Sequence, residues 1–186
     1  DFRNYNELSI NLSSGTNILF GDNAQGKTNI LEAIYLSATT KSHKGSKDSD
    51  IIRFGSEEAH IRTILSNNEY ESRIDMHLRK NKSKGIAVDG VRLKKASELL
   101  GLLNVVFFSP EDLSIVKDGP SVRRRFIDME LCQLDKIYIS NLTNYKKVLE
   151  QRNNLLKQIS FDRSKADMLS VWDAQLLKYG IEIIRK

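Results

Sequence analysis

Cysteine is nearly absent from this sequence, since Cys132 is the single one among 186 residues. One cysteine cannot form an internal disulfide, and a typical zinc site needs two or more, so we predict neither. No run of about 18 apolar residues is present, so we predict no membrane-spanning helix. No charged and then apolar leader opens the chain, so nothing indicates secretion. Together these absences predict a protein of the reducing cytoplasm.

A strong excess of one charge is also absent, because 29 lysines and arginines face 24 aspartates and glutamates, for a net charge of +5. This excess is compatible with nucleic-acid binding but does not demonstrate it. The basic residues instead gather in clusters. Two clusters are candidate DNA contacts: Arg79, Lys80, Lys82 and Lys84, and Arg123, Arg124 and Arg125. Such clusters are often solvated surface, and we expect at least one arginine to pair with an acid, as Arg124 could with Asp128.

Apolar patterns of period two, or short continuous apolar runs, predict β-strands in the first two thirds of the chain. These segments are residues 8–12, 17–20, 70–78 and 105–108. The last of them is continuously apolar, as expected of a buried strand. Asp89-Gly90 is a strong signal for a tight hairpin turn. This part of the chain is therefore predicted to be rich in β-hairpins.

Apolar residues at helical spacing predict a helix over residues 28–38 and a largely helical chain from Pro120 onward. Proline suits the first turn of a helix. Farther on, residues 138–159 and 169–183 carry apolar stripes of period 3.5, interrupted only by Arg152. A short polar connector joins the two stripes, which predicts an antiparallel helical hairpin. Packing of both helices on a globular core is the alternative.

The sequence GDNAQGKT fits the phosphate-binding pattern G-x-x-x-x-G-K-[ST] at every fixed position. Two glycines let the backbone wind tightly, so that successive N–H groups point at phosphate oxygens, and the following helix aims its positive end there. The lysine reaches the β and γ phosphates, and the threonine hydroxyl ligates Mg²⁺. We therefore predict a P-loop that binds a nucleotide and Mg²⁺. Its residues are Gly21, Asp22, Asn23, Ala24, Gln25, Gly26, Lys27 and Thr28, the last of which is the metal ligand.

The other half of a nucleotide site is not recognisable. A Walker B strand ends in an acid, but the candidate strand 105–108 ends in Ser109, and Asp112 lies too far on. No GTPase base-reading motif is present. The three histidines show no metal-ligand spacing, and we predict no catalytic residue in this chain. The pattern is typical of P-loop ATPases in which a long insertion separates the two Walker motifs.

Four stretches together resemble the RecF family, in the SMC-like branch of the ABC ATPases. They are FRNY at 2–5, GDNAQGKTNILEAIYL at 21–36, FFSPEDLSIVKDGPSVRRRFIDMELCQ at 107–133 and NYKKVLEQRNNLLK at 144–157. The resemblance implies an α/β fold, with a P-loop ABC-type ATPase lobe bearing β-rich hairpins over residues 1–119. An antiparallel helical hairpin, as arm or second lobe, would follow over 120–186. It also implies that Arg3 lies near the nucleotide phosphates.

The same resemblance implies a function. The nucleotide would be ATP, and the protein would form an ATP-dependent homodimer on gapped DNA and single-strand/double-strand junctions. Partner mediators of the RecO/RecR type would join it in loading recombinase. Relatives carry the signature and Walker B motifs in a C-terminal segment, so the full-length dimer would be a slow DNA-stimulated ATPase and this chain alone essentially inactive. A small P-loop phosphotransferase is the alternative.

Overall fold

The computed structural model describes residues 1–66 and 69–186, and the chain divides into two compact units, Asp1–Ser109 and Pro110–Lys186. The predicted domain boundary at residues 119/120 lies farther along the chain. The reason is that the second unit begins with helical turns, a 3₁₀ helix at Pro110–Leu113 and α3 at Ser114–Lys117, and α3 packs against the helix that follows it. The predicted α/β fold class is confirmed.

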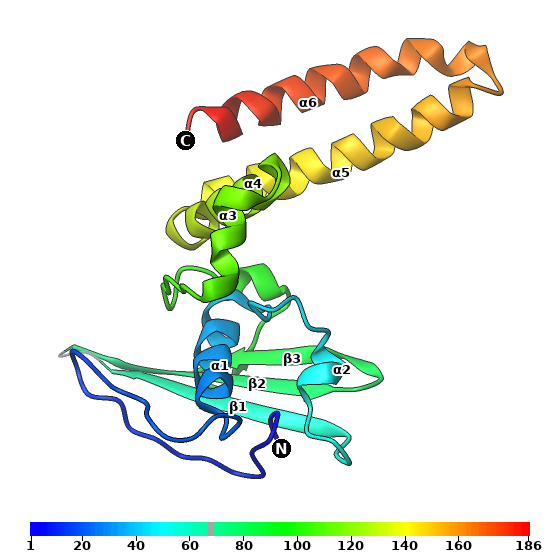
Figure 1. Cartoon of the computed structure of the whole chain (residues 1–186). Helices are drawn as coiled ribbons and strands as arrows, with labels where there is room; N and C mark the ends of the chain where they lie inside the picture. The colour runs from blue at the N-terminus through cyan, green and yellow to red at the C-terminus, as the bar shows by residue number, and fades with distance from the viewer. Residues whose placement is uncertain (67–68) are drawn as a thin grey trace. The chain divides into compact units, whose positions relative to one another are not determined.

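A four-stranded antiparallel sheet in the order β1-β2-β3-β4 forms the base of the first unit, within the described residues (Figure 1). The strands are β1 (Glu58–Ser66), β2 (Glu71–Arg79), β3 (Lys82–Val88) and β4 (Val91–Arg92). Side chains of β1 and β2 alternate between a buried and an exposed face, as period-two patterning predicts. Asp89 and Gly90 both have positive φ, 50° and 82°, and turn the chain between β3 and β4. The predicted hairpin is therefore confirmed.

Helix α1 (Lys27–Thr39) covers the buried face of this sheet, and the short α2 (Asp48–Ile51) packs on β2 (Figure 1). The predicted helix is confirmed, but its buried face is not the one that apolar spacing favoured. Leu31 is exposed, whereas Glu32 and Ser37 are fully buried. The Ser37 hydroxyl is satisfied locally, since it donates to the Ala33 carbonyl and accepts from Thr63 of β1. Internal hydrogen bonds thus let polar residues occupy the core.

The predicted strands at residues 8–12, 17–20 and 105–108 are wrong for this structure, because these segments have no regular secondary structure. Several of their apolar side chains are exposed, including those of Ile18, Phe20 and Val106. A strand forms only beside another strand that accepts and donates its backbone hydrogen bonds. Among the described residues, these three segments belong to no β-ladder. Apolar patterning indicates local β propensity, but it does not supply a partner.

The second unit is an antiparallel pair of long helices with a shorter helix before it. Its elements are α4 (Pro120–Leu134), α5 (Lys136–Ile159), a 3₁₀ helix at Arg163–Met168, and α6 (Leu169–Ile184). Helices α5 and α6 pack along each other, which confirms the predicted hairpin (Figure 1). In α5 the residues Val148 and Leu155 are buried, whereas the period-3.5 stripe runs through their neighbours Leu149 and Leu156, which are exposed. Because two apolar residues are adjacent at each of these places, the sequence alone does not decide which of them is buried.

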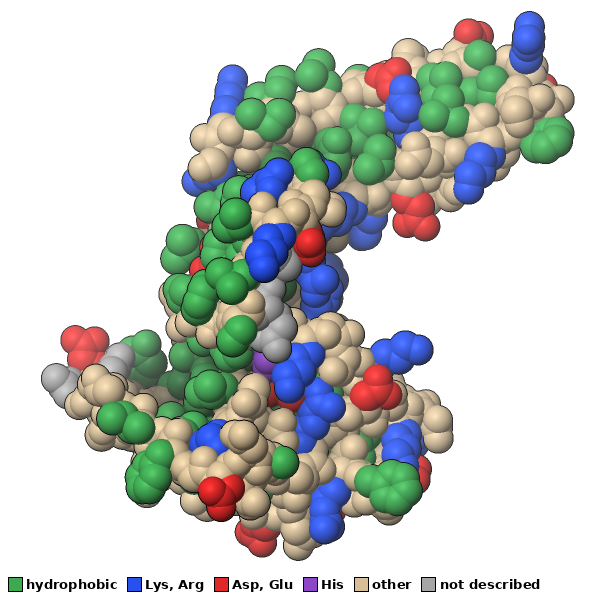
Figure 2. Space-filling view, viewed as in Figure 1, with side chains coloured by type: hydrophobic (Ala, Val, Ile, Leu, Met, Phe, Trp, Pro, Cys, Tyr) green, Lys and Arg blue, Asp and Glu red, His purple; other side chains and the backbone are tan. Residues whose placement is uncertain are grey.

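Arg152, the one polar residue in the predicted stripe, has a specific partner. Its Nε lies 2.5 Å from Asp173 Oδ1, so the interruption becomes an ion pair between α5 and α6. Near the other end of the hairpin the ring of Tyr145 packs against Gly180, where an added Cβ would lie 3.4 Å from the ring. Hydrophobic side chains are also exposed over this unit (Figure 2). No helix among the described residues is long and apolar enough to cross a bilayer.

Candidate functional site

The predicted phosphate-binding loop lies directly before α1, with the helix beginning at Lys27. Gly21 and Gly26 have φ of 134° and 97°, and Ala24, between them, also has a positive φ of 64°. These left-handed positions wind the loop back on itself, which turns consecutive N–H groups toward one side. Most of the loop is exposed to solvent. The loop thus lies at the positive end of a 13-residue helix, where backbone N–H groups favour an anion.

Lys27 spans the loop from the helix end. Its Nζ donates to the carbonyl oxygens of Gly21, at 2.7 Å, and Asp22, at 2.6 Å. An ammonium group has three N–H donors, so one remains for a phosphate oxygen while the other two hold the loop. Thr28, the predicted Mg²⁺ ligand, is the second residue of the helix and is exposed. The residue types and positions fit a nucleotide with its metal ion.

Two residues from the start of the chain support the loop, and the sequence analysis missed both. Asn4 Nδ2 and the Tyr5 hydroxyl donate to the Gln25 carbonyl, at 3.3 and 3.2 Å. Asn29 in turn donates to Asn4 Oδ1 at 2.8 Å. A Cβ added to Gly26 would lie 2.6 Å from Asn4 Oδ1 and 2.7 Å from the Tyr5 hydroxyl. The positive φ at position 26 favours glycine, and a Cβ there would also displace the Asn4 and Tyr5 side chains that contact the loop. A signal for both residues lies in FRNY, where the sequence prediction concerned the arginine alone.

Arg3 forms the strongest side-chain interaction near the site. Its Nε and Nη2 donate to the two carboxylate oxygens of Glu32, at 2.8 and 2.7 Å, and Nη2 and Nη1 also reach Ser46 Oγ and the Asp50 carbonyl. Bidentate pairing of this kind fixes both partners. The predicted contact of Arg3 with nucleotide phosphates stays a prediction. The structure gives this arginine a bracing role that ties the chain start to α1.

Glu32 is a fully buried acid on α1, and sequence analysis missed it as well. Burial raises the pKa of its carboxyl, but hydrogen bonds from Arg3 and Ser42, with the nearby arginine charge, outweigh burial and leave the pKa below its ordinary value. The Ser42 hydroxyl lies 2.5 Å from Glu32 Oε1. The carboxylate is therefore ionised and fully partnered. It connects α1 to Arg3 at the start of the chain and to Ser42 in the segment after the helix.

A hollow of about 670 Å³ opens beside the P-loop. Asn4 and Asn29, which support the loop, also form part of its wall. The basic side chains of Arg3, Arg53 and Lys80 line it as well. Asp50 lines it too, and the three cations pair with Glu32, Asp1 and Glu57, so their charges are largely balanced.

The four residues of the first predicted DNA cluster do not share one exposed surface in the structure. Lys84 is turned inward, where its Nζ lies 2.8 Å from Asp48 Oδ1 and donates to the Thr40 carbonyl. Lys80 pairs with the exposed Glu57 at 3.0 Å, and Arg79 donates to the Ser83 carbonyl at 3.2 Å. Lys82 is exposed at the start of β3. The cluster thus offers exposed cations at the β2–β3 turn, with Lys84 used internally.

The second predicted cluster lies on the first turns of α4, and Arg123, Arg124 and Arg125 are all exposed. Arg123 donates to the Asp118 carbonyl at 3.1 Å. The expected Arg124–Asp128 pair is wrong, since the described residues contain no such ion pair. Asp128 instead accepts a hydrogen bond from the Tyr138 hydroxyl at 2.7 Å and lies 3.6 Å from Lys146. The reason is that its side of α4 packs on α5.

Comparison with known proteins agrees with this geometry. A family model described as an AAA domain matches residues 1–179. The chain is 64% identical over 186 residues to the DNA replication and repair protein RecF of Lachnoclostridium phytofermentans, covering all of this chain and 52% of that protein. The chain spans about half the length of the curated relatives it matches.

Solved structures give the same result. A RecF structure, described as the recombination mediator RecF with ATP in the RecFOR pathway, is 40% identical and superposes with a TM-score of 0.92, covering 99% of this chain and 50% of that one. An SMC ATPase structure has a TM-score of 0.54 at 23% identity, over 68% of this chain and 92% of that one. The second likeness concerns the fold alone.

Proposed function

The chain belongs to the AAA domain family and resembles the N-terminal portion of RecF over its whole length, and from this premise we propose that it binds ATP in a DNA recombination and repair protein. The observation that carries the proposal is the P-loop, whose left-handed residues, helix start and Lys27 all have the required form. The similarity to RecF solved with ATP supports the choice of nucleotide. A small P-loop phosphotransferase is not favoured by these comparisons.

The phosphates of ATP would lie on the loop amides, with Lys27 at the β and γ phosphates and the Thr28 hydroxyl on Mg²⁺. Asn4, Tyr5 and Asn29 would hold the loop in this form without touching the metal. Preorganised N–H groups lose little freedom when the nucleotide binds. The metal also needs an acid, and the apolar segment 105–108 is followed by Ser109. Asp89 follows the apolar end of β3, but its carboxylate accepts hydrogen bonds from Ser72 and the Arg73 amide in the turn.

The whole protein would act as an ATP-dependent homodimer that binds gapped DNA in the cytoplasm, together with partner mediators of the RecO/RecR type. Residues 8–12 and 17–20 carry strand-like apolar patterns but form no strand within the described residues. ATP would act as a switch for assembly on DNA, since the site in this chain lacks the groups that complete hydrolysis.

The 186-residue chain is expected to bind ATP weakly and to release phosphate no faster than its Lys27→Ala variant. The reason is that no Walker B acid completes the Mg²⁺ shell and no signature reaches the γ phosphate. Phosphate release, measured with enough protein to detect one turnover, tests this. ATP turnover by the unaltered chain that is lost in the Lys27→Ala variant would mean that this chain contains a complete hydrolytic site. The phosphotransferase alternative would then be favoured.

DNA is expected to be held through its phosphates, because the basic clusters contain few aromatic side chains that could stack on bases. Binding to unrelated duplexes should therefore weaken steeply with salt, with a log–log slope near −0.9 per neutralised phosphate. Neutralising Arg79, Lys80 and Lys82, or Arg123, Arg124 and Arg125, should make the slope shallower by about one unit for each phosphate that is no longer neutralised. Fluorescence anisotropy at several salt concentrations measures the slope.

Lys165, on the connector between α5 and α6, provides the matched control, because it is a lysine outside both clusters. Its replacement by glutamine should leave the salt slope unchanged. If neither cluster alters the slope more than Lys165→Gln does, both clusters are solvated surface and the DNA-binding face lies elsewhere.

A further inference from the structure

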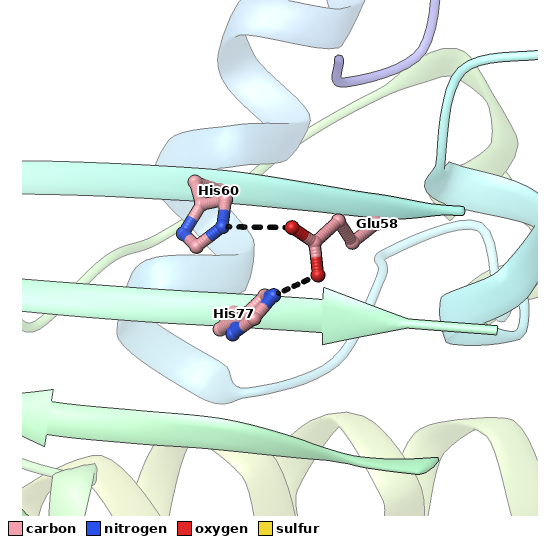
Figure 3. Close-up of side chains that lie close together, drawn as sticks. All are labelled: Glu58, His60 and His77. Atoms are coloured by element: carbon pink, nitrogen blue, oxygen red, sulfur yellow. Dashed lines mark hydrogen bonds and ion pairs between the residues drawn. The ribbon is translucent and has the colours of Figure 1, made fainter. Parts of the chain in front are cut away.

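The exposed face of the sheet carries three metal-ligating side chains close together. Glu58 and His60 are two residues apart on β1, so both point away from the core, and His77 is directly opposite His60 on β2 (Figure 3). The sequence spacing of the histidines gave no sign of this, because they are far apart along the chain. The antiparallel register alone brings them together.

The potential ligand atoms of the three residues lie close together. Nε2 of His77 lies 2.7 Å from Glu58 Oε2, and Nε2 of His60 lies 3.8 Å from Glu58 Oε1. One ligand atom from each residue lies within 4.8 Å of the other two. Tetrahedral zinc, with bonds near 2.0–2.2 Å, needs neighbouring ligand atoms about 3.3 Å apart. The two imidazole rings are stacked in this structure, with centroids 4.0 Å apart and 23° between their planes. Both rings would therefore have to turn out of the stack for their nitrogens to meet Glu58 at one ion.

The surroundings leave these ligands accessible. The side chains of Glu58 and His60 are 55% and 66% exposed. On the other side of His77, its β3 partner is Gly85, which has no side chain to cover the ring. A bound ion could thus keep a water molecule in a fourth position, as three-ligand zinc sites do.

Neighbouring arginines do not compete for the carboxylate. Arg62 and Arg73 point to the same face, but both bind Asp75, at 2.7 and 2.8 Å. Arg79 is the cross-strand partner of Glu58, yet its guanidinium donates to the Ser83 carbonyl. Glu58 instead pairs with the two histidines. The carboxylate is therefore directed at the imidazoles rather than at a fixed cation.

We propose that Glu58, His60 and His77 form a surface binding site for a divalent transition-metal ion, with Zn²⁺ as the preferred ion. Two imidazole nitrogens and one carboxylate oxygen suit zinc and its neighbours, whereas Mg²⁺ and Ca²⁺ prefer oxygen ligands alone. The ion would cross-link β1 to β2 on the face opposite α1. The site is separate from the P-loop and does not depend on the proposed ATP binding.

Titration of the tag-free, nucleotide-free chain with ZnCl₂, followed by calorimetry, tests the proposal. We expect about one Zn²⁺ per chain at micromolar affinity, and no binding of Mg²⁺ under the same conditions. His60→Gln, His77→Gln and Glu58→Gln should each weaken Zn²⁺ binding by at least about tenfold, because each removes one of three ligands. Cobalt substitution should give the absorption bands of a four-coordinate ion, which these variants lose.

Glu57→Gln is the matched control, since Glu57 is an exposed acid next to the site that pairs with Lys80 and not with the histidines. It should bind Zn²⁺ within about twofold of the unaltered chain. Circular dichroism of each variant checks folding, which surface substitutions should preserve. The proposal is overturned if no stoichiometric Zn²⁺ binding occurs, or if both histidine variants bind as tightly as the unaltered chain.

Discussion

Replacing Lys27 by alanine is expected to lower ATP affinity by more than about tenfold while leaving the fold intact. The lysine makes a charge-assisted contact with a polyphosphate, and loss of such a contact costs about 2–3 kcal/mol. The variant also loses the two hydrogen bonds from Nζ to the Gly21 and Asp22 carbonyls, so the loop is less well held before ATP arrives. Titration with a fluorescent ATP analogue measures the affinity.

Lys44→Ala is the matched control, because Lys44 is an exposed lysine of the same unit outside the P-loop. It removes the same charge and should bind the analogue with unaltered affinity. Circular dichroism should give the same spectrum for both variants. Equal affinity of Lys27→Ala and the unaltered chain would mean that the loop does not bind the phosphates.

Replacing Arg3 by alanine is expected to destabilise the first unit by about 3 kcal/mol. The substitution leaves the Glu32 carboxylate buried with only Ser42 beside it, and removal of one partner from a buried pair costs about 3–5 kcal/mol. The stability of Arg3→Lys should lie between that of the unaltered chain and that of Arg3→Ala, because lysine keeps the charge but cannot form the bidentate contact. Denaturation followed by circular dichroism measures the loss. Fluorescence of Trp172, the only tryptophan, reports the helical unit separately and should not change.

Arg53→Ala provides the control for this loss. Arg53 pairs with Asp1 at 3.6 Å, with side chains that are 43% and 41% exposed, and such surface pairs contribute about 0–1 kcal/mol. A loss no larger for Arg3→Ala than for Arg53→Ala would show that the Glu32 pair does not stabilise the unit.

The stability difference between the unaltered chain and Arg3→Ala should depend on pH. The pKa of Glu32 is lower in the folded chain, so its pairing contributes in full above the ordinary glutamate pKa of about 4.3. That contribution is lost as the pH falls from there through the lower folded pKa. The two unfolding free energies should therefore converge below pH of about 4.3 and stay apart at neutral pH. If the difference between the two unfolding free energies does not change with pH, Arg3 stabilises the unit by something other than its charge pairing with Glu32.

The elements predicted correctly are those whose cause lies within a few consecutive residues. The hairpin followed from Asp89-Gly90, and α1, α5 and α6 followed from apolar spacing within each helix. Positive φ at glycine, a lysine at a helix start and an amphipathic stripe are local properties. Even so, the choice between Val148 and Leu149 as the buried residue needed the neighbouring helix.

The sequence by itself therefore determined that this chain has β-hairpins, a helix after the GDNAQGKT motif and a helical hairpin. Only the tertiary structure decided which apolar segments became strands, because residues 8–12 and 17–20 have the pattern but join no described sheet. It alone joined Arg3 to Glu32, 29 residues away, and His60 to His77 across two strands. Such contacts depend on register and packing, which bring together groups whose distance along the chain carries no information about their distance in space.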